Sequence, residues 1–205
     1  MIISFTGPSG TGKTTLAFRL LENFPQTARL LTSYTTRSPR HNDIRVGNHE
    51  EYHYLSTEAF TQMHREDQFE WTDDVRDYYY GTTRASLDHA VATLNQLWIM
   101  ILTVSTLPKF YKAMERRNAS SAACSIFIRP PHTAVLKERL ASRNLTEEAM
   151  RNEIARFADW ERQAMTLNLP LHYVMDTNNL IDVKYREVLG IISKIKESHR
   201  IRTVS

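Results

Sequence analysis

The chain has 205 residues and a formal net charge of +3, with 41% hydrophobic and 24% charged residues. This composition is typical of a globular protein with one core, and the chain is too short for two domains of average size. No apolar run approaches the ~20 residues of a membrane-spanning helix, and the charge suits an anionic ligand but is too small to indicate nucleic acid.

Cysteine content and the start of the chain favour a cytoplasmic protein. The first residues are already strand-like, which leaves no room for an export signal. The one cysteine, Cys124, excludes an internal disulfide and suits a reducing compartment. Because it lies in the apolar run 122–128, we expect a buried structural thiol rather than a nucleophile. The basic C-terminal end is interpreted as a solvated helix end rather than a nucleic-acid site.

The first elements in the chain frame a phosphate-binding loop. Residues 1–6 (MIISFT) predict a buried strand, and the apolar spacing in 16–21 predicts a helix that ends before Pro25. Between them, residues 7–14 (GPSGTGKT) fit the pattern Gly-x4-Gly-Lys-Ser/Thr in its strand-loop-helix context. Backbone N–H groups and the positive helix end would cradle phosphate oxygens there. A Gly-rich turn that binds nothing is the alternative.

This motif predicts an ATP site that uses Mg²⁺. Lys13 would reach the β and γ phosphates, and the Thr14 hydroxyl would join the Mg²⁺ shell. The predicted ATP-binding residues are Gly7, Ser9, Gly10, Thr11, Gly12, Lys13, Thr14 and Thr15, with Thr14 as the metal ligand.

The next part of the chain reads as a small β-rich insertion over residues 33–83. A strand at 28–31 leads into the polar, Pro-containing segment 32–40, which cannot be helical, and then into an exposed loop at 41–50. A strand at 51–55 and a helix at 57–65 with Ser56 as its cap follow. Residues 69–71 and 78–80 predict two short strands joined by an acidic turn.

The second half alternates helices with apolar strands. The expected helices are 84–94, 107–117, 132–142, 146–165 and 180–197, and the expected strands are 97–104, 124–128 and 171–175. The run 97–104 is the longest, so we expect it at the centre of the sheet. The alternation predicts an α/β fold with a doubly wound, five-stranded parallel sheet, whose core comprises residues 1–32 and 84–205.

Taken together, these segments resemble the guanylate kinase family over most of the chain. Ser33 and the run 35–40 (TTRSPR) resemble that family's acceptor-phosphate loop, and 51–56, 69–71 and 79–82 resemble its later acceptor segments. Residues 127–131 (FIRPP), followed by Arg139 and Arg143, resemble the lead-in to an arginine-bearing lid. The resemblance implies a P-loop kinase fold with an acceptor-binding insertion, a helical lid at about 137–156, and phosphorylation of GMP or dGMP by ATP.

The resemblance assigns the acceptor site to Ser33, Arg37, Arg40, Tyr52, Glu70, Tyr80 and Thr82. Arginines can clamp a monophosphate with charge-assisted hydrogen bonds, and tyrosines add neutral ones. A carboxylate such as Glu70 would accept from N1–H and the 2-amino group of guanine, whereas adenine would leave a buried group unpaired. The alternatives are surface positions for the two arginines, core positions for the tyrosines and a solvated strand position for Glu70.

The same resemblance assigns catalysis to Lys13, Arg139 and Arg143. The family's third lid arginine falls at Glu153, and we expect Arg156, one helical turn later, to take its place. A phosphate nucleophile is already ionised, so no general base is required, and these cations would neutralise charge in the transition state. Closure of the lid would expel water. We expect no partners besides nucleotide substrates, with the protein acting as a monomer or a homodimer.

One departure from the family pattern concerns the strand at 97–104. The family's Asp-x-Asp-Val-Gln-Gly segment corresponds here to residues 101–106 (ILTVST), and no acid lies between Asp88 and Glu115. Mg²⁺ would then depend on Thr14, nucleotide oxygens and water. Thr103 would supply a hydroxyl to the acceptor base. A ribose 1,5-bisphosphate phosphokinase that forms PRPP, and a catalytically silent interaction module, are the alternative functions.

Overall fold

The structure is a computed structural model that describes residues 1–39, 45–46, 49–75, 77–129, 137–138, 147–174 and 181–202. The chain divides into two compact units. The first comprises Met1–Ile3, Ala17–Met100 and Thr106–Ala123, and the second comprises Ser4–Leu16, Ile101–Ser105 and Cys124–Ser205. Among the described residues, no helix is long and apolar enough to cross a membrane.

A five-stranded sheet has the order β11-β10-β1-β9-β2. Its strands are β1 (Ile2–Thr6), β2 (Ala28–Leu30), β9 (Leu97–Ile101), β10 (Ala123–Ile128) and β11 (Leu171–Val174). The printed pairs β2 with β9 and β10 with β11 are parallel, with Ala28 opposite Leu97 and Ser125 opposite Leu171. The prediction of a parallel five-stranded sheet in an α/β fold is therefore confirmed.

The expectation that the strand at 97–104 lies at the centre of the sheet is wrong. β1 holds the middle position, and all five of its residues are buried. β9 already ends at Ile101, and a 3-10 helix, η1, occupies Val104–Thr106. Leu102 and Val104 are buried although they lie outside the strand. The apolar run is longer than the strand because the core continues past the point where the ladder ends.

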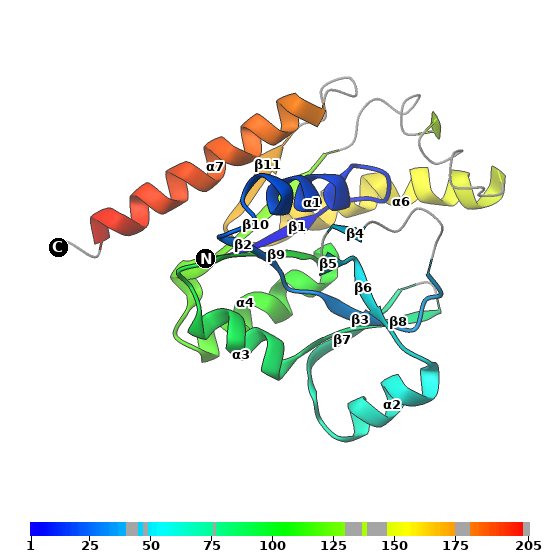
Figure 1. The fold of residues 1–205 in the computed structure, drawn as a ribbon. Helices are drawn as coiled ribbons and strands as arrows, with labels where there is room; N and C mark the ends of the chain where they lie inside the picture. The colour runs from blue at the N-terminus through cyan, green and yellow to red at the C-terminus, as the bar shows by residue number, and fades with distance from the viewer. Residues whose placement is uncertain are drawn as a thin grey trace. The chain divides into compact units, whose positions relative to one another are not determined.

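Helices alternate with these strands, as the chain order in Figure 1 shows. They are α1 (Lys13–Asn23), α3 (Arg84–Ala92), α4 (Leu107–Arg116), the 3-10 helix η2 (Ser120–Ala122), α6 (Glu147–Thr166) and α7 (Ile181–Arg202). Pro108 lies in the first turn of α4, where the ring costs no hydrogen bond. The helix expected at 132–142 falls almost wholly outside the described residues.

A second sheet, with the order β6-β3-β8-β7, lies within the first unit. Its strands are β3 (Ser33–Thr35), β6 (Tyr52–Tyr54), β7 (Phe69–Val75) and β8 (Tyr78–Thr83). Two further short strands, β4 (Arg45–Val46) and β5 (His49–Glu50), pair with each other in the segment expected to be a loop.

The amide of Ala59 donates to Ser56 Oγ (3.1 Å), which confirms Ser56 as the cap of α2 (Thr57–Arg65).

Aromatic packing holds α2 against the second sheet, beside which it is drawn in Figure 1. The ring of Phe60 stacks on Phe69 at 4.5 Å and on Tyr79 at 5.6 Å between ring centroids. Phe60 and Phe69 are buried, and burying a phenylalanine stabilises a fold by about 1.5–3 kcal/mol. This small core gives the sheet one covered face, so the opposite face is available for polar residues.

The hairpin formed by β7 and β8 corrects the predicted acidic turn. Its ladder continues to the pair of Val75 and Tyr78, so Asp73 and Asp74 belong to a strand. Acidic residues have a low intrinsic preference for strands, but pairing with β8 outweighs that preference here. The ladder also has an irregularity between Phe69 and Trp71, and Glu70 is the extra residue there.

Cys124 lies on the second residue of β10 and is free and buried. Burial raises the pKa of the Cys124 thiol to about 12. The expectation of a structural thiol rather than a nucleophile is therefore confirmed, because the reactive species is the thiolate.

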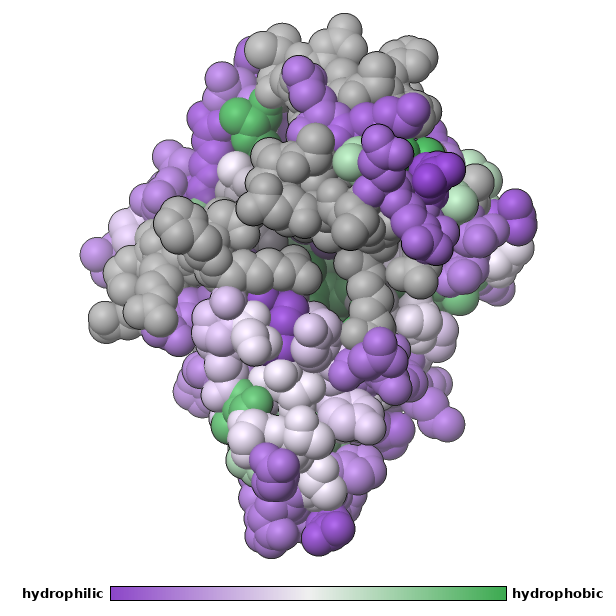
Figure 2. Space-filling view, turned by 90° about the vertical axis from the view of Figure 1, so that its right-hand side faces the viewer, coloured by the Kyte–Doolittle hydropathy of each residue, from purple (hydrophilic) through white to green (hydrophobic). Residues whose placement is uncertain are grey.

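On the face that Figure 2 displays, described residues are mostly hydrophilic and the hydrophobic ones form small separate spots, as on ordinary protein surfaces.

Candidate functional site

The segment between β1 and α1 has the geometry of a phosphate-binding loop. Gly7, Gly10 and Gly12 have φ values of 134°, 82° and 89°, a region that side-chain-bearing residues rarely adopt. A Cβ atom on Gly7 would lie only 2.5 Å from the carbonyl oxygen of Ile128. Glycine is therefore required at position 7 both by the backbone angle and by the close approach of β10.

Hydrogen bonds within the second unit fix the carbonyl groups of this loop. Lys13 Nζ donates to the carbonyl oxygens of Gly7 (2.9 Å) and Pro8 (2.7 Å), and the Thr11 hydroxyl donates to Pro8 (3.0 Å). Lys184 Nζ, from α7, donates to the carbonyl oxygen of Thr11 (2.8 Å). With these carbonyl groups bound on the protein side, the loop amides can point toward an anion at the N-terminus of α1.

Thr14 is the second residue of α1 and is partly exposed, while Thr15 is exposed. The Thr14 hydroxyl is the kind of neutral oxygen that Mg²⁺ accepts when phosphate oxygens and water complete its shell. No group of three or more His, Cys, Asp or Glu suited to a metal is found in the part of the chain that the structure describes. The Thr14 hydroxyl therefore fits an Mg²⁺ ion whose other ligands are nucleotide oxygens and water.

A cluster of one arginine and three tyrosines lies on the second sheet. The Arg37 guanidinium stands over the rings of Tyr52 and Tyr54, 5.2 and 5.6 Å from their centroids. The Tyr80 ring is 5.6 Å from that of Tyr52. Arg37 is 5% exposed and also donates to the carbonyl oxygen of Ser38 at 2.9 Å. The sheet therefore holds a cation and phenol groups together at one end.

Burial raises the pKa of Tyr52, and the neighbouring Glu51 and Tyr80 raise it further. The Tyr52 phenol therefore stays protonated at every physiological pH and remains a hydrogen-bond donor. Arg37 acts in the opposite direction on this pKa but does not outweigh the desolvation. A buried arginine and a permanent phenol donor together suit a small anion such as a phosphate monoester.

Ser33 and Thr82 lie next to this cluster on the same face of the sheet. Their hydroxyl groups are 3.2 Å apart, and Ser33 is directly opposite Tyr52 in the β3-β6 ladder. Residues directly opposite in a ladder share a face. The hairpin register adds two more residues to that face, because Trp71 is opposite Thr82 and Asp73 is opposite Tyr80.

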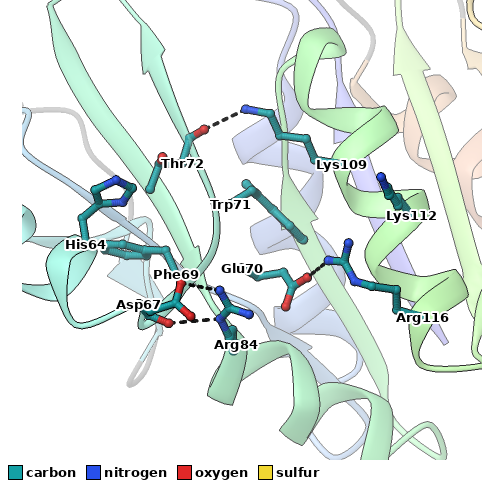
Figure 3. A pocket seen from close by; sticks show the side chains of 10 residues that line it. All are labelled: His64, Asp67, Phe69, Glu70, Trp71, Thr72, Arg84, Lys109, Lys112 and Arg116. Atoms are coloured by element: carbon teal, nitrogen blue, oxygen red, sulfur yellow. Dashed lines mark hydrogen bonds and ion pairs between the residues drawn. The ribbon is translucent and has the colours of Figure 1, made fainter.

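Glu70, which was predicted to read a base, is bound by two arginines. Its carboxylate accepts hydrogen bonds from Arg116 and from Arg117, the latter at 2.7 Å, and only 3% of its side chain is exposed. Figure 3 shows Glu70 pointing toward Arg116 on α4. Desolvation raises the pKa of Glu70, but the hydrogen bonds from both arginines outweigh it and hold that pKa below its usual value.

Figure 3 also shows the pocket of about 400 Å³ beside Glu70. It is lined by His64, Asp67, Phe69, Glu70, Trp71, Thr72, Arg84, Lys109, Lys112 and Arg116. Its charged groups largely pair with one another or with the backbone: Arg84 with Asp67, Arg116 with Glu70, and Lys109 with the carbonyl oxygen of Thr72 at 2.8 Å. These pairs link β7 to α4, and the residues just before β7 to α3.

Asp73 was not among the predicted site residues. Its carboxylate accepts from the buried Thr106 hydroxyl and from Lys109 Nζ (2.7 Å), and 13% of its side chain is exposed. Sequence reasoning missed it because the residues between the predicted strands 69–71 and 78–80 were interpreted as a turn. The available signal was the period of two in a strand: Asp73 is two residues from Trp71 on a ladder that includes Tyr80.

Several predicted residues cannot be placed with these groups. Arg40, Arg139 and Arg143 lie outside the described residues, and Arg156 lies in α6 but its side chain is not among those described. Thr103 belongs to the second unit, where its hydroxyl is 2.8 Å from that of Ser105. The roles assigned to these residues stay predictions.

A comparison with protein families matches this chain over residues 1–195 to the family described as guanylate kinase. The chain belongs to the guanylate kinase family. Among the relatives of this guanylate kinase family member, the guanylate kinase of Mycoplasma mobile is 31% identical over 204 residues, covering 98% of this chain and 94% of the relative. That of Synechocystis is 36% identical over 148 residues, covering 72% and 71%.

Solved structures agree on the fold. Guanylate kinase from Anaplasma phagocytophilum matches 95% of this chain and 85% of its own with a TM-score of 0.66 at 21% identity. A gluconokinase from Sinorhizobium meliloti matches with a TM-score of 0.51 at 14% identity. At such identities the two structures bear on the fold alone, and the fold expected from the sequence, that of a P-loop kinase, is confirmed.

Proposed function

We propose that this guanylate kinase family member transfers the γ-phosphoryl group of ATP to GMP, giving ADP and GDP. The observation that carries the proposal is the match to the family over residues 1–195 together with an intact phosphate loop. dGMP is the second acceptor we propose. On this basis we retain residues 33–83 as the acceptor-binding insertion, and 1–32 and 84–205 as the core with its lid at about 137–156.

The donor half of the reaction depends on the loop Gly7–Thr14. Its amides and the N-terminus of α1 hold the phosphates of ATP, and Lys13 leaves its carbonyl partners to reach the β and γ phosphates. The Thr14 hydroxyl, nucleotide oxygens and water would hold Mg²⁺, which would neutralise charge on the phosphates. We propose Arg139, Arg143 and Arg156 as the lid cations that stabilise the transferring group.

The acceptor half depends on Arg37, Tyr52 and Tyr80. Arg37 binds the acceptor phosphate with charge-assisted hydrogen bonds, and the two phenols donate further ones. We include Arg40 in this clamp from its place in the sequence. The nucleophilic phosphate oxygen is ionised near neutral pH, so these residues position the acceptor and remove no proton from it.

The base of the acceptor meets Ser33 and Thr82 in our proposal, with Thr103 as a further hydroxyl. Two carboxylates of β7 are candidates for reading guanine. The sequence pattern points to Glu70, whereas the ladder register puts Asp73 on the face that carries Tyr80 and Thr82. Because Glu70 points toward Arg116 whereas Asp73 shares the face of Tyr80, we propose that Asp73 reads the base, with Lys109 and Thr106 holding its carboxylate.

An acceptor screen tests the function directly. ADP formation is measured with GMP, dGMP, AMP, UMP, CMP and ribose 1,5-bisphosphate, using Lys13→Met as the inactive control. We expect turnover with GMP and dGMP and at least tenfold less with the other nucleotides. Turnover only with ribose 1,5-bisphosphate would establish the phosphokinase that forms PRPP, and no turnover with any acceptor would favour a silent interaction module.

We also propose a cytoplasmic location and action as a monomer or homodimer. The free, buried Cys124 supports a reducing compartment, since nothing in its surroundings requires a disulfide. Size-exclusion chromatography with light scattering determines the oligomeric state, with and without nucleotide.

A further inference from the structure

Lys184 is a fully buried lysine next to the phosphate loop. It lies on α7, within the second unit, and is 1% exposed. Its Nζ donates to the carbonyl oxygen of Thr11 at 2.8 Å. A Cβ atom built on Gly12 would lie 3.8 Å from the same nitrogen. The ammonium group therefore stands at the backbone of the two loop residues that precede Lys13.

The sequence around Lys184 shows that a lysine is unexpected there. Tyr185, Val188 and Ile192 are buried and Ile181 is partly buried, so this face of α7 is apolar at helical spacing. A lysine on such a face ordinarily turns its charge to water, but this one is directed into the protein. Burying an ammonium is costly unless polar groups bind it, and the loop carbonyl of Thr11 is one such group.

We propose that Lys184 is a positioning residue for ATP: it holds the Thr11 carbonyl away from the phosphate site and adds a second positive charge behind the loop. A peptide carbonyl fixed on one side turns the adjoining N–H toward the other side, so this bond orients the amide of Gly12. The charge acts over a short distance in a region shielded from water, where electrostatic interactions are strong. The residue acts through the loop backbone and needs no contact with ATP.

Lys184 donates a hydrogen bond to the loop that is proposed to bind ATP. Lys13 and Lys184 hold different carbonyl groups of the loop, those of Gly7 and Pro8 for the first and that of Thr11 for the second. Loss of Lys184 should therefore change the affinity for ATP while leaving GMP binding in place. A merely structural lysine would instead lower the stability of the free protein and the binding of both nucleotides together.

The test compares four proteins: wild type, Lys184→Met, Lys184→Gln and Lys196→Met. Methionine removes charge and donor, glutamine retains a donor without charge, and Lys196 is an exposed residue of the same helix that serves as control. Calorimetric titration with a non-hydrolysable ATP analogue and Mg²⁺ gives the affinity for the donor, and a parallel titration gives that for GMP. Thermal unfolding without nucleotide reports whether each variant folds.

For Lys184→Met we expect the Kd of the ATP analogue to rise about tenfold to a hundredfold, as for loss of a charged hydrogen bond, with GMP binding within twofold. The Kd for Lys184→Gln should lie between those of the wild type and Lys184→Met, and the Kd for Lys196→Met should match that of the wild type. Unchanged affinity for the analogue in a folded Lys184→Met or Lys184→Gln protein would overturn the inference, as would equal losses for both nucleotides. The inference rests on the proposed ATP site: a wild type that does not bind the analogue would refute the proposed function itself.

Discussion

Replacing Glu70 by glutamine separates a structural role from a base-reading role. The substitution keeps the shape of the side chain but removes its charge and turns one acceptor oxygen into an amide that faces a guanidinium. The side chain is 3% exposed, and its arginine partners are 16% exposed for Arg117 and 52% for Arg116. A hydrogen bond between charged groups contributes about 1.5–3 kcal/mol, while a half-exposed ion pair contributes about 0–1 kcal/mol. We therefore expect the free energy of unfolding to fall by about 2–4 kcal/mol.

Urea unfolding at neutral pH measures this loss, and its pH dependence tests the cause. The hydrogen bonds from both arginines hold the pKa of Glu70 below that of a free carboxyl group, despite desolvation. The folded protein thus gains stability above the pKa of the unfolded side chain, about 4.3, and loses this gain as the pH falls through the lower folded pKa. The difference between wild type and Glu70→Gln should accordingly shrink below about pH 4.

The acceptor preference completes this test. We expect Glu70→Gln to keep the ratio of kcat/KM for GMP over AMP within about threefold, because the Glu70 carboxylate points toward Arg116 on α4. Asp73→Asn, the matched variant, should lower that ratio about tenfold to a hundredfold through loss of a buried hydrogen bond. An unfolding free energy within about 0.5 kcal/mol of wild type, combined with a lost preference in Glu70→Gln alone, would refute the structural role and restore Glu70 as the base reader.

Two further substitutions and one alkylation reaction test separate parts of the structure. Gly7→Ala should abolish binding of an ATP analogue, measured by calorimetry. The added Cβ would lie 2.5 Å from the Ile128 carbonyl oxygen, and the φ of 134° at this position is strained for alanine. Normal binding would contradict the geometry of the loop. Arg37→Met should raise the KM for GMP at least tenfold and leave that for ATP within twofold, and equal changes would speak against a phosphate clamp. Cys124 should resist iodoacetamide at pH 8 in the native protein and react in urea, because burial raises its pKa to about 12; rapid native alkylation would disprove its burial.

The phosphate loop could be predicted from the sequence because its signal is local. The glycines of residues 7–12 dictate backbone angles, and the strand and helix on either side are defined by patterns of a few residues. The cap at Ser56 has the same character, since its partner amide is three residues away. Where neighbouring residues determine the structure, the sequence pattern was sufficient.

Contacts between distant segments could not be predicted in this way. The hydrogen-bond partners of Glu70 are 46 and 47 residues away, and Thr11 and Lys184 are 173 residues apart. A sequence motif that includes Glu70 gives the residue type but not the direction of its side chain. The one-residue irregularity in the β7-β8 ladder changes that direction. The predicted boundaries of the β7-β8 hairpin were wrong for a related reason. Asp73 and Asp74 adopt strand structure because they pair with residues of β8.

The placement of charges gives a common reason for these differences from the family pattern. The stretch between Asp88 and Glu115 contains no acid, so the carboxylates expected on the strand at 97–104 are missing. The second sheet carries a carboxylate instead, that of Asp73, and Thr106, the last residue of η1, donates a hydrogen bond to it. Near the phosphate loop, the buried ammonium of Lys184 adds positive charge and donates a hydrogen bond to the carbonyl oxygen of Thr11. A triphosphate carries several negative charges, so an added cation favours its binding, and in the function that we propose Thr14 is the side-chain ligand to Mg²⁺.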